Sequence, residues 1–190
     1  MSERPHFVTM LRANSVARSM SFEAPVVTES TPKMISSAIR PPKSVVMLDS
    51  MLPGSAAGRL SDAELLRLDS ALADSRYRHA LVVLHHHPVP SNSVWLDTVG
   101  LEEPHRFLDI LAKHPRVRGV LWGHVHQAFD GMHGNLQMMA TPSTCVQFKP
   151  LVVDFELDTR PPGFRLLTLQ DDGRIDSQVE WLVPNDGPNE

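Results

Sequence analysis

The most distinct pattern in the chain is a set of three short apolar runs separated by amphipathic segments. Residues 45–48, 80–84 and 117–122 are almost entirely apolar, as expected of strands that are buried on both faces of a parallel sheet. Between the first two, Ser-Asp-Ala-Glu at 61–64 is a capping box, in which the serine and the glutamate each satisfy a backbone amide of the other. Between the last two, residues 103–114 have helical periodicity. The alternation predicts a strand–helix–strand–helix–strand unit.

After residue 122 the sequence has only strand and turn signals. We expect a turn at 171–173 and strands at 136–140, 145–148, 151–157, 164–169 and 175–182. A strand–helix unit followed by a run of strands is typical of an α/β fold built as a layered sandwich, with mixed sheets flanked by helices.

The composition of the chain changes near residue 44. Residues 1–44 hold six basic and three acidic residues, whereas residues 45–190 hold 12 basic and 19 acidic ones. The first segment is rich in Ser, Pro and Thr and has no sustained periodicity. The sequence therefore predicts an irregular N-terminal segment over 1–44 and a folded domain over 45–190.

Overall composition narrows the class of protein. A net charge of −4 without a basic stripe argues against a nucleic-acid partner. No apolar run approaches the ~20 residues that a membrane span needs. The single cysteine, Cys145, suits a reducing compartment. We therefore expect a cytoplasmic protein that binds neither nucleic acid nor membrane. A homodimer is compatible with this composition.

Histidines follow two of the predicted strands directly. His85, His86 and His87 come after the second apolar run, and His124 and His126 come after the third. The carboxyl ends of neighbouring parallel strands meet at one edge of a sheet, which is where ligands bind in open α/β sheets. In an extended segment, residues two positions apart face the same way. Imidazole nitrogens suit Zn, Mn, Fe or Co, so the pattern predicts a metal site; surface or structural histidines are the alternative.

Four stretches carry a family resemblance. Residues 84–90, Leu-His-His-His-Pro-Val-Pro, resemble the histidine–proline motif of calcineurin-like metallophosphoesterases, and residues 123–126, Gly-His-Val-His, match the closing motif of that superfamily. Residues 46–50 and residues 140–150, which include Thr-Pro-Ser-Thr-Cys, resemble the bacterial class III 3′,5′-cyclic-AMP phosphodiesterases. The resemblance extends over about residues 45–183.

The resemblance implies a metallophosphoesterase that hydrolyses 3′,5′-cyclic AMP to AMP at two divalent metals, drawn from Fe, Mn, Zn and Co. By that resemblance His85 and His124 would bind one metal and His126 the other. The loop of residues 88–100 would line the nucleotide pocket. Candidate substrate-binding residues are His86, Asn92 and Trp95, although His86 equally suits a supporting role and Trp95 a packing role.

The sequence also departs from the family pattern. The family motifs Asp-x-His, Gly-Asp and Gly-Asn-His are absent, so no catalytic residue is identified and the protonating histidine of the family has no counterpart. We expect a fold without its N-terminal half, from a truncated or frameshifted reading frame or with a partner chain supplying that half. Such a chain would bind at most one metal, weakly, with little or no activity. The alternatives are a non-catalytic remnant or interaction module, and a metallophosphoesterase for another phosphoester or pyrophosphate.

Overall fold

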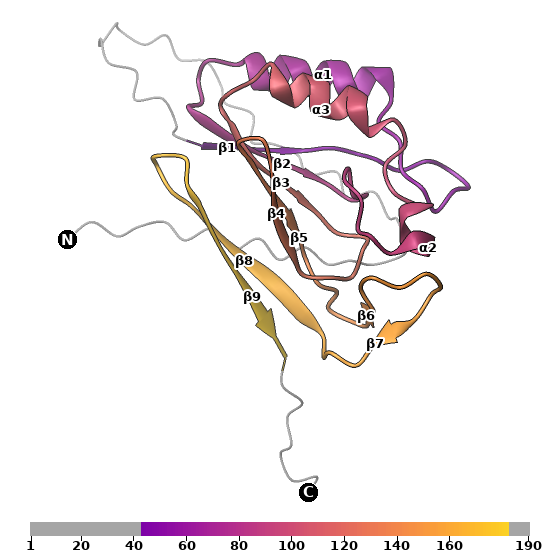
Figure 1. The fold of residues 1–190 in the computed structure, drawn as a ribbon. Coiled ribbons are helices and arrows are strands. Elements are labelled where there is room, and N and C mark those ends of the chain that lie inside the picture. Colours follow the sequence, from indigo (N-terminus) through magenta and orange to yellow (C-terminus); the bar gives the residue numbers. More distant parts are fainter. Residues whose placement is uncertain (1–42, 183–190) are drawn as a thin grey trace, which may run out of the picture.

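A five-stranded sheet forms the centre of the protein (Figure 1), whose residues 43–182 are described by a computed structural model. The predicted irregular segment 1–44 lies outside the described residues, apart from its last two. In spatial order the strands are β1 (Lys43–Met47), β2 (His79–Leu84), β3 (Val117–Trp122), β5 (Leu136–Ala140) and β4 (Phe129–His133). The first four are parallel, and β4 pairs with β5 in the antiparallel direction. The predicted mixed α/β architecture and its three apolar strands are confirmed.

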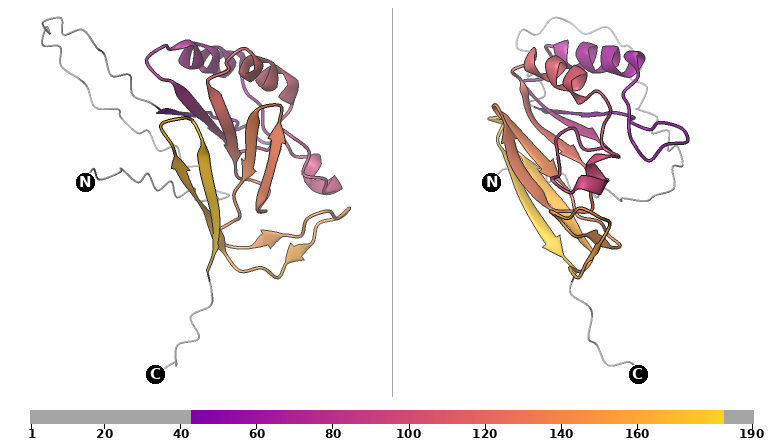
Figure 2. Two further views of the ribbon diagram at one scale, coloured as in Figure 1. Left: turned by 60° about the vertical axis from the view of Figure 1, so that its left-hand side comes forward. Right: turned by 45° about the vertical axis from the view of Figure 1, so that its right-hand side comes forward.

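Two helices cover one face of the sheet (Figures 1 and 2). They are α1 (Asp62–Ala73) and α3 (Pro104–Ala112), and each connects two neighbouring parallel strands. Burial of their apolar faces against the sheet forms the main core. The core residues contributed by these helices and strands include Val46, Leu65, Leu68, Leu72, Val82, Phe107, Leu111, Val120 and Met138.

The start of α1 differs from the predicted capping box in one respect. The Ser61 hydroxyl accepts a hydrogen bond from the Glu64 amide at 3.2 Å, as predicted. The Glu64 carboxylate, however, accepts from the amide of Asp49 at 2.8 Å and pairs with Arg67. The predicted return bond to Ser61 is therefore wrong, because the Glu64 side chain instead ties the helix to the loop that follows β1.

The opposite face of the sheet is covered by a hairpin of β8 (Gly163–Leu169) and β9 (Ile175–Trp181). The second core cluster lies beneath it and consists of Leu81, Val83, Leu121, Met139 and Leu167. The buried Arg165 of β8 fixes the hairpin, since its guanidinium binds the Asp130 carboxylate at 2.7 Å and donates to the Ala140 carbonyl at 3.0 Å. The hairpin leaves part of β1 uncovered, where Val45 is 44% and Met47 60% exposed.

The segment after β5 differs most from the predicted elements. Residues 145–158 form only the two-residue strands β6 (Gln147–Phe148) and β7 (Leu157–Asp158), so the strand predicted at 151–157 is wrong. The carbonyls of this segment bind instead to α2 (Val94–Asp97), a short helix that the sequence pattern did not predict. Its first two amides donate to the carbonyls of Val152 and Val153 at 2.9 and 3.1 Å.

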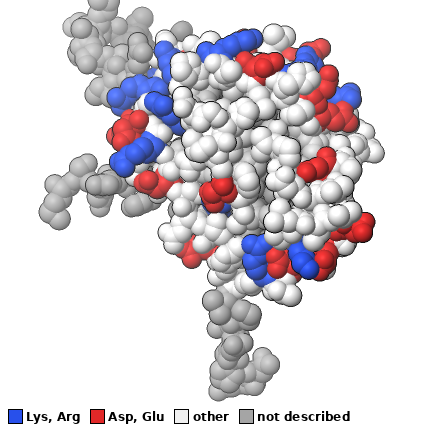
Figure 3. All heavy atoms as spheres, viewed as in Figure 1, with Lys and Arg blue, Asp and Glu red and all other residues white. Residues whose placement is uncertain are grey.

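The surface has no single-sign stripe on the face shown in Figure 3. There, Lys and Arg side chains gather beside Asp and Glu near the rim, and most of the remaining face is neutral apart from a few acidic side chains. Within residues 43–182 no helix is long and apolar enough to cross a membrane.

Candidate metal centre

Two neighbouring parallel strands bring the histidines together. Leu84 of β2 and Trp122 of β3 are partners in the sheet, so the segments that follow them leave the same edge side by side. There His85, His86 and His124 place one potential ligand nitrogen each within 4.8 Å of one another. The centroid of the His124 ring lies 5.1 Å from that of His85 and 4.7 Å from that of His86.

The segment that carries His124 is a tight turn rather than the extended strand we expected. His124 and His126 both have left-handed backbones, with φ of 62° and 49°, and the Val125 amide donates to the Gly123 carbonyl at 2.6 Å. His126 is not one of the three clustered histidines. Its Nδ1 lies 2.9 Å from the Val146 carbonyl, and its ring stacks on Phe148 at 4.2 Å.

His86 is held by residues from the loop after β1. Its Nδ1 hydrogen-bonds the Ser50 hydroxyl at 2.8 Å, across 36 positions of sequence. Both side chains are buried. The ring lies against Gly58, where an added Cβ would come within 2.2 Å of it. The bond to Ser50 fixes the orientation of the His86 ring, as outer partners do for metal-binding histidines.

His86 is buried, His124 half-buried and His85 exposed, and this partial burial keeps the imidazoles neutral near pH 7. It lowers the pKa of His124 to about 3 and that of His86 to about 4, with a further decrease from the neighbouring histidines. The pKa of His85 is also lowered, first by burial and then by the charge of His126. Neutral imidazoles offer the lone pairs that metals require.

The cluster fits a divalent transition metal. Within the described part of the chain, the buried Nε2 of His124 has no hydrogen-bond partner. Such an atom is costly unless something binds it. Together with two more nitrogens close by, it makes a donor set that suits Zn, Mn, Fe or Co.

Two of the candidate substrate residues, Asn92 and Trp95, follow the triple histidine in the segment that leads into α2 and in α2 itself. Asn92 is exposed, in a turn with φ of 63°. Trp95 is half-buried and meets Phe148 and Phe155 edge-on at 5.2 and 5.1 Å. Because Phe148 also stacks on His126, these rings form one aromatic group that extends from Trp95 to the histidines.

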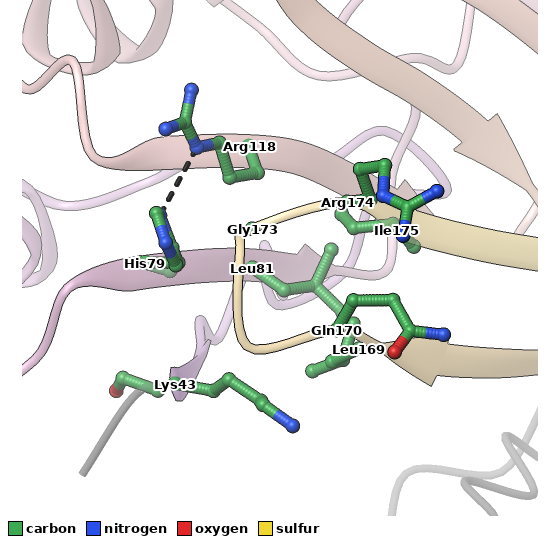
Figure 4. Close-up of a pocket in the computed structure, with 11 residues that line it drawn as sticks. Lys43, His79, Leu81, Arg118, Leu169, Gln170, Gly173, Arg174 and Ile175 are labelled. Carbon is green, nitrogen blue, oxygen red and sulfur yellow. Dashed lines mark hydrogen bonds between the residues drawn. The ribbon is translucent and has the colours of Figure 1, made fainter.

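A hollow at the other edge of the sheet has a different character (Figure 4). It lies where β1, β2 and β3 begin, with Leu81 and Lys43 in its wall. The Lys43 ammonium is paired with Asp171 at 2.7 Å. The Arg118 guanidinium donates to Nδ1 of His79 at 3.1 Å. The cations here are thus engaged in local contacts, and this hollow shares no residue with the histidine cluster.

Sequence comparison identifies relatives of about twice the matched length. The 3′,5′-cyclic adenosine monophosphate phosphodiesterase CpdA of Pseudomonas aeruginosa is 48% identical over 135 residues, which are 71% of this chain and 50% of the relative. CpdA of Vibrio vulnificus is 47% identical over 139 residues, 73% of this chain and 51% of the relative. CpdA of Escherichia coli K12 is 43% identical over 139 residues, which are 73% of this chain and 50% of the relative. The chain spans about half the length of the curated relatives it matches.

No protein-family model matches the chain. Among solved structures, a dimetal phosphatase from Danio rerio aligns with a TM-score of 0.41 at 20% identity, over 64% of this chain and 38% of that one.

The sequence relatives define the class. Over the matched residues the chain is homologous to cyclic-nucleotide phosphodiesterases, which are phosphoester hydrolases, and the resemblance predicted from the histidine motifs is confirmed. Within that class, its relatives at 42 to 48% identity are bacterial cyclic-AMP phosphodiesterases named CpdA.

Proposed function

We propose that this chain forms the histidine-rich part of a metal-dependent phosphodiesterase that hydrolyses 3′,5′-cyclic AMP to AMP. The observation that carries the proposal is the cluster of His85, His86 and His124 at the carboxyl edge of the sheet, in a chain homologous to such enzymes. A divalent metal held there supplies a Lewis acid for a phosphoryl oxygen. In this account His86 is a ligand positioned by Ser50, not the substrate contact suggested by the sequence.

His126 has a separate role in the proposal. It lies close enough to His85 for its charge to lower the pKa of that residue, yet its ring is held by Phe148 and the Val146 carbonyl. This position beside the cluster of His85, His86 and His124 suits a contact to a second metal or to the phosphate. The adjoining aromatic group with Trp95 would offer its ring faces to the adenine base.

The described residues supply an incomplete donor set for two metals. The cluster contains three imidazoles and, among residues 43–182, no carboxylate. Two dications a few ångströms apart repel strongly without an anionic bridge. Asp49 accepts from the Met51 amide at 2.9 Å, and Asp130 is paired with Arg165. We therefore propose one weakly held metal in this part, and activity that needs ligands from elsewhere.

A second function has one observation in its favour. Val45 and Met47 leave an apolar surface on β1, whose outer edge is not paired within the described sheet. Exposed apolar strands attract other chains, as an interaction module without activity would use them. Light scattering after size exclusion would reveal self-association, and Met47→Lys should abolish it.

Hydrolysis assays test the main proposal. The chain would be assayed with cyclic AMP and Mn²⁺, alone and mixed with the half of the P. aeruginosa relative that it does not match. His124→Ala is the control in both cases. We expect no activity above that control for the chain alone, and His124-dependent activity in the mixture. High activity of the chain alone would contradict the incomplete site, and inactive mixtures would contradict the proposed hydrolase.

A further inference from the structure

The third histidine of the triple run, His87, lies outside the metal cluster and is almost fully buried, with 4% of its surface exposed. Its Nε2 lies 3.2 Å from Oδ1 of Asp97. A carboxylate only accepts hydrogen bonds at neutral pH, so the ring proton is on Nε2. Gly100 provides the space, because an added Cβ there would come within 2.9 Å of that nitrogen.

The His87 ring also contacts a proposed metal ligand. It lies nearly parallel to the ring of His124, at 17° and with 5.7 Å between centroids. On another side, His124 meets the ring of His86 at 4.7 Å. The orientation of the His124 imidazole is therefore limited by its neighbours, and one of these, His87, is itself fixed by Asp97.

Asp97 has a second set of contacts. Its carboxylate accepts from the amide and the hydroxyl of Ser91, both at 2.7 Å, and from the amide of Asn92 at 3.1 Å. These bonds close the turn in front of α2. One side chain thus connects the loop carrying the candidate substrate residues to the histidine that packs against His124.

We propose that Asp97 and the buried His87 form a positioning pair, which fixes the His124 imidazole and couples it to the turn at Ser91 and Asn92. The inference rests on the proposed metal centre and adds two residues that act through a ligand rather than as ligands. Hydrogen-bonded partners behind metal-binding histidines typically change metal affinity by about 10- to 100-fold when they are removed; His87 acts on His124 by packing, so we expect the lower end of that range.

Cobalt binding tests the pair. Co²⁺ affinity and the visible absorption of the bound ion would be measured for the wild type, Asp97→Ala, Asp97→Asn and His87→Phe. Asp109→Asn, an exposed carboxylate on α3, is the matched control. Asp97→Ala and His87→Phe should weaken binding by about 10-fold or more and change the spectrum. Asp97→Asn keeps the shape of the side chain, so its Co²⁺ affinity should lie between the affinities of those two variants and that of the wild type. Asp109→Asn should leave the affinity unchanged.

Two metal-free measurements separate positioning from folding. The thermal midpoint of each apo variant should stay close to that of the wild type, while ¹⁵N NMR should show the His87 proton on Nε2 only when Asp97 is present. If the wild type binds Co²⁺ and Asp97→Ala binds it equally well with the same spectrum, the inference is overturned and the metal centre stands. If the wild type does not bind Co²⁺, both are overturned.

Discussion

The ionisable side chains at the two ends of the same parallel strands differ in their burial and in their partners. At the carboxyl end, four imidazoles are packed against one another and their pKa values are lowered by burial. At the amino end, Lys43 pairs with Asp171 and Arg174 with Asp172, and the carboxylates are largely exposed. Within one sheet, the ionisable groups at the carboxyl end are thus shielded from water, whereas those at the amino end are exposed to it.

The difference shows what burial contributes. Exposed ion pairs gain little, since water screens them and the side chains lose freedom. Imidazoles shielded from water bind protons less tightly and keep their lone pairs free for a metal. The same shielding makes the folded protein less stable in acid.

The largest effect should be the pH dependence of the metal-free protein. The folded-state pKa values of His124 and His86 are about 3 and about 4, below the value of about 6.5 for an unfolded histidine. As the pH falls from 6.5 towards 4, the unfolded chain therefore binds more protons than the folded one, and stability is lost. We expect the free energy of unfolding to fall by roughly 2 to 4 kcal/mol between pH 7 and pH 5. Urea unfolding at several pH values measures it.

The matched control for that experiment is His124→Asn, which removes one of the buried imidazoles. Its stability should depend less steeply on pH over the same range. Parallel curves for the variant and the wild type would contradict the assigned cause.

A smaller effect is expected from Gly58→Ala. The new Cβ would come within 2.2 Å of the His86 ring, so the ring must move away from Ser50. Overpacking of this kind costs about 1 to 3 kcal/mol, and metal affinity should fall too. Gly123→Ala is the comparison, because its Cβ would lie at an ordinary 3.4 Å from His85. Equal stabilities of the two variants in urea would refute the close fit.

The smallest effect should come from the amino end. Lys43→Ala removes the ion pair with Asp171, whose side chain is 73% exposed. Pairs of this kind contribute ~0.2–1 kcal/mol, so unfolding in urea should shift only slightly, and less at high salt. A loss comparable to that of Gly58→Ala would remove the contrast between the two ends.

The sequence alone predicted the part of the fold that depends on continuous apolar runs. The strand at 117–122 has the predicted bounds, and the histidines that follow β2 and β3 meet at one edge. The apolar residues of 151–157 misled the prediction, because Leu151 has a left-handed backbone with φ of 62° and the following carbonyls cap α2. Strand β4 was missed since all five of its residues are exposed or half-buried.

The pairing of ligands could not be predicted from local pattern. His86 joins the cluster through Ser50, a contact across 36 positions, and no periodicity reports such a contact. The expectation for His124 and His126 assumed an extended backbone, whereas both residues have positive φ. Which histidines share a metal therefore depends on a turn that only the fold reveals.

A Co²⁺ titration of the histidine variants tests the central claim most directly. His85, His86 and His124 are the proposed ligands, and His126 serves as the comparison. The account predicts one equivalent of bound Co²⁺ in the wild type, no measurable binding in His124→Ala, strongly weakened binding in His86→Ala, and nearly unchanged binding in His126→Ala. Loss of binding in His126→Ala with full binding in His86→Ala would contradict it.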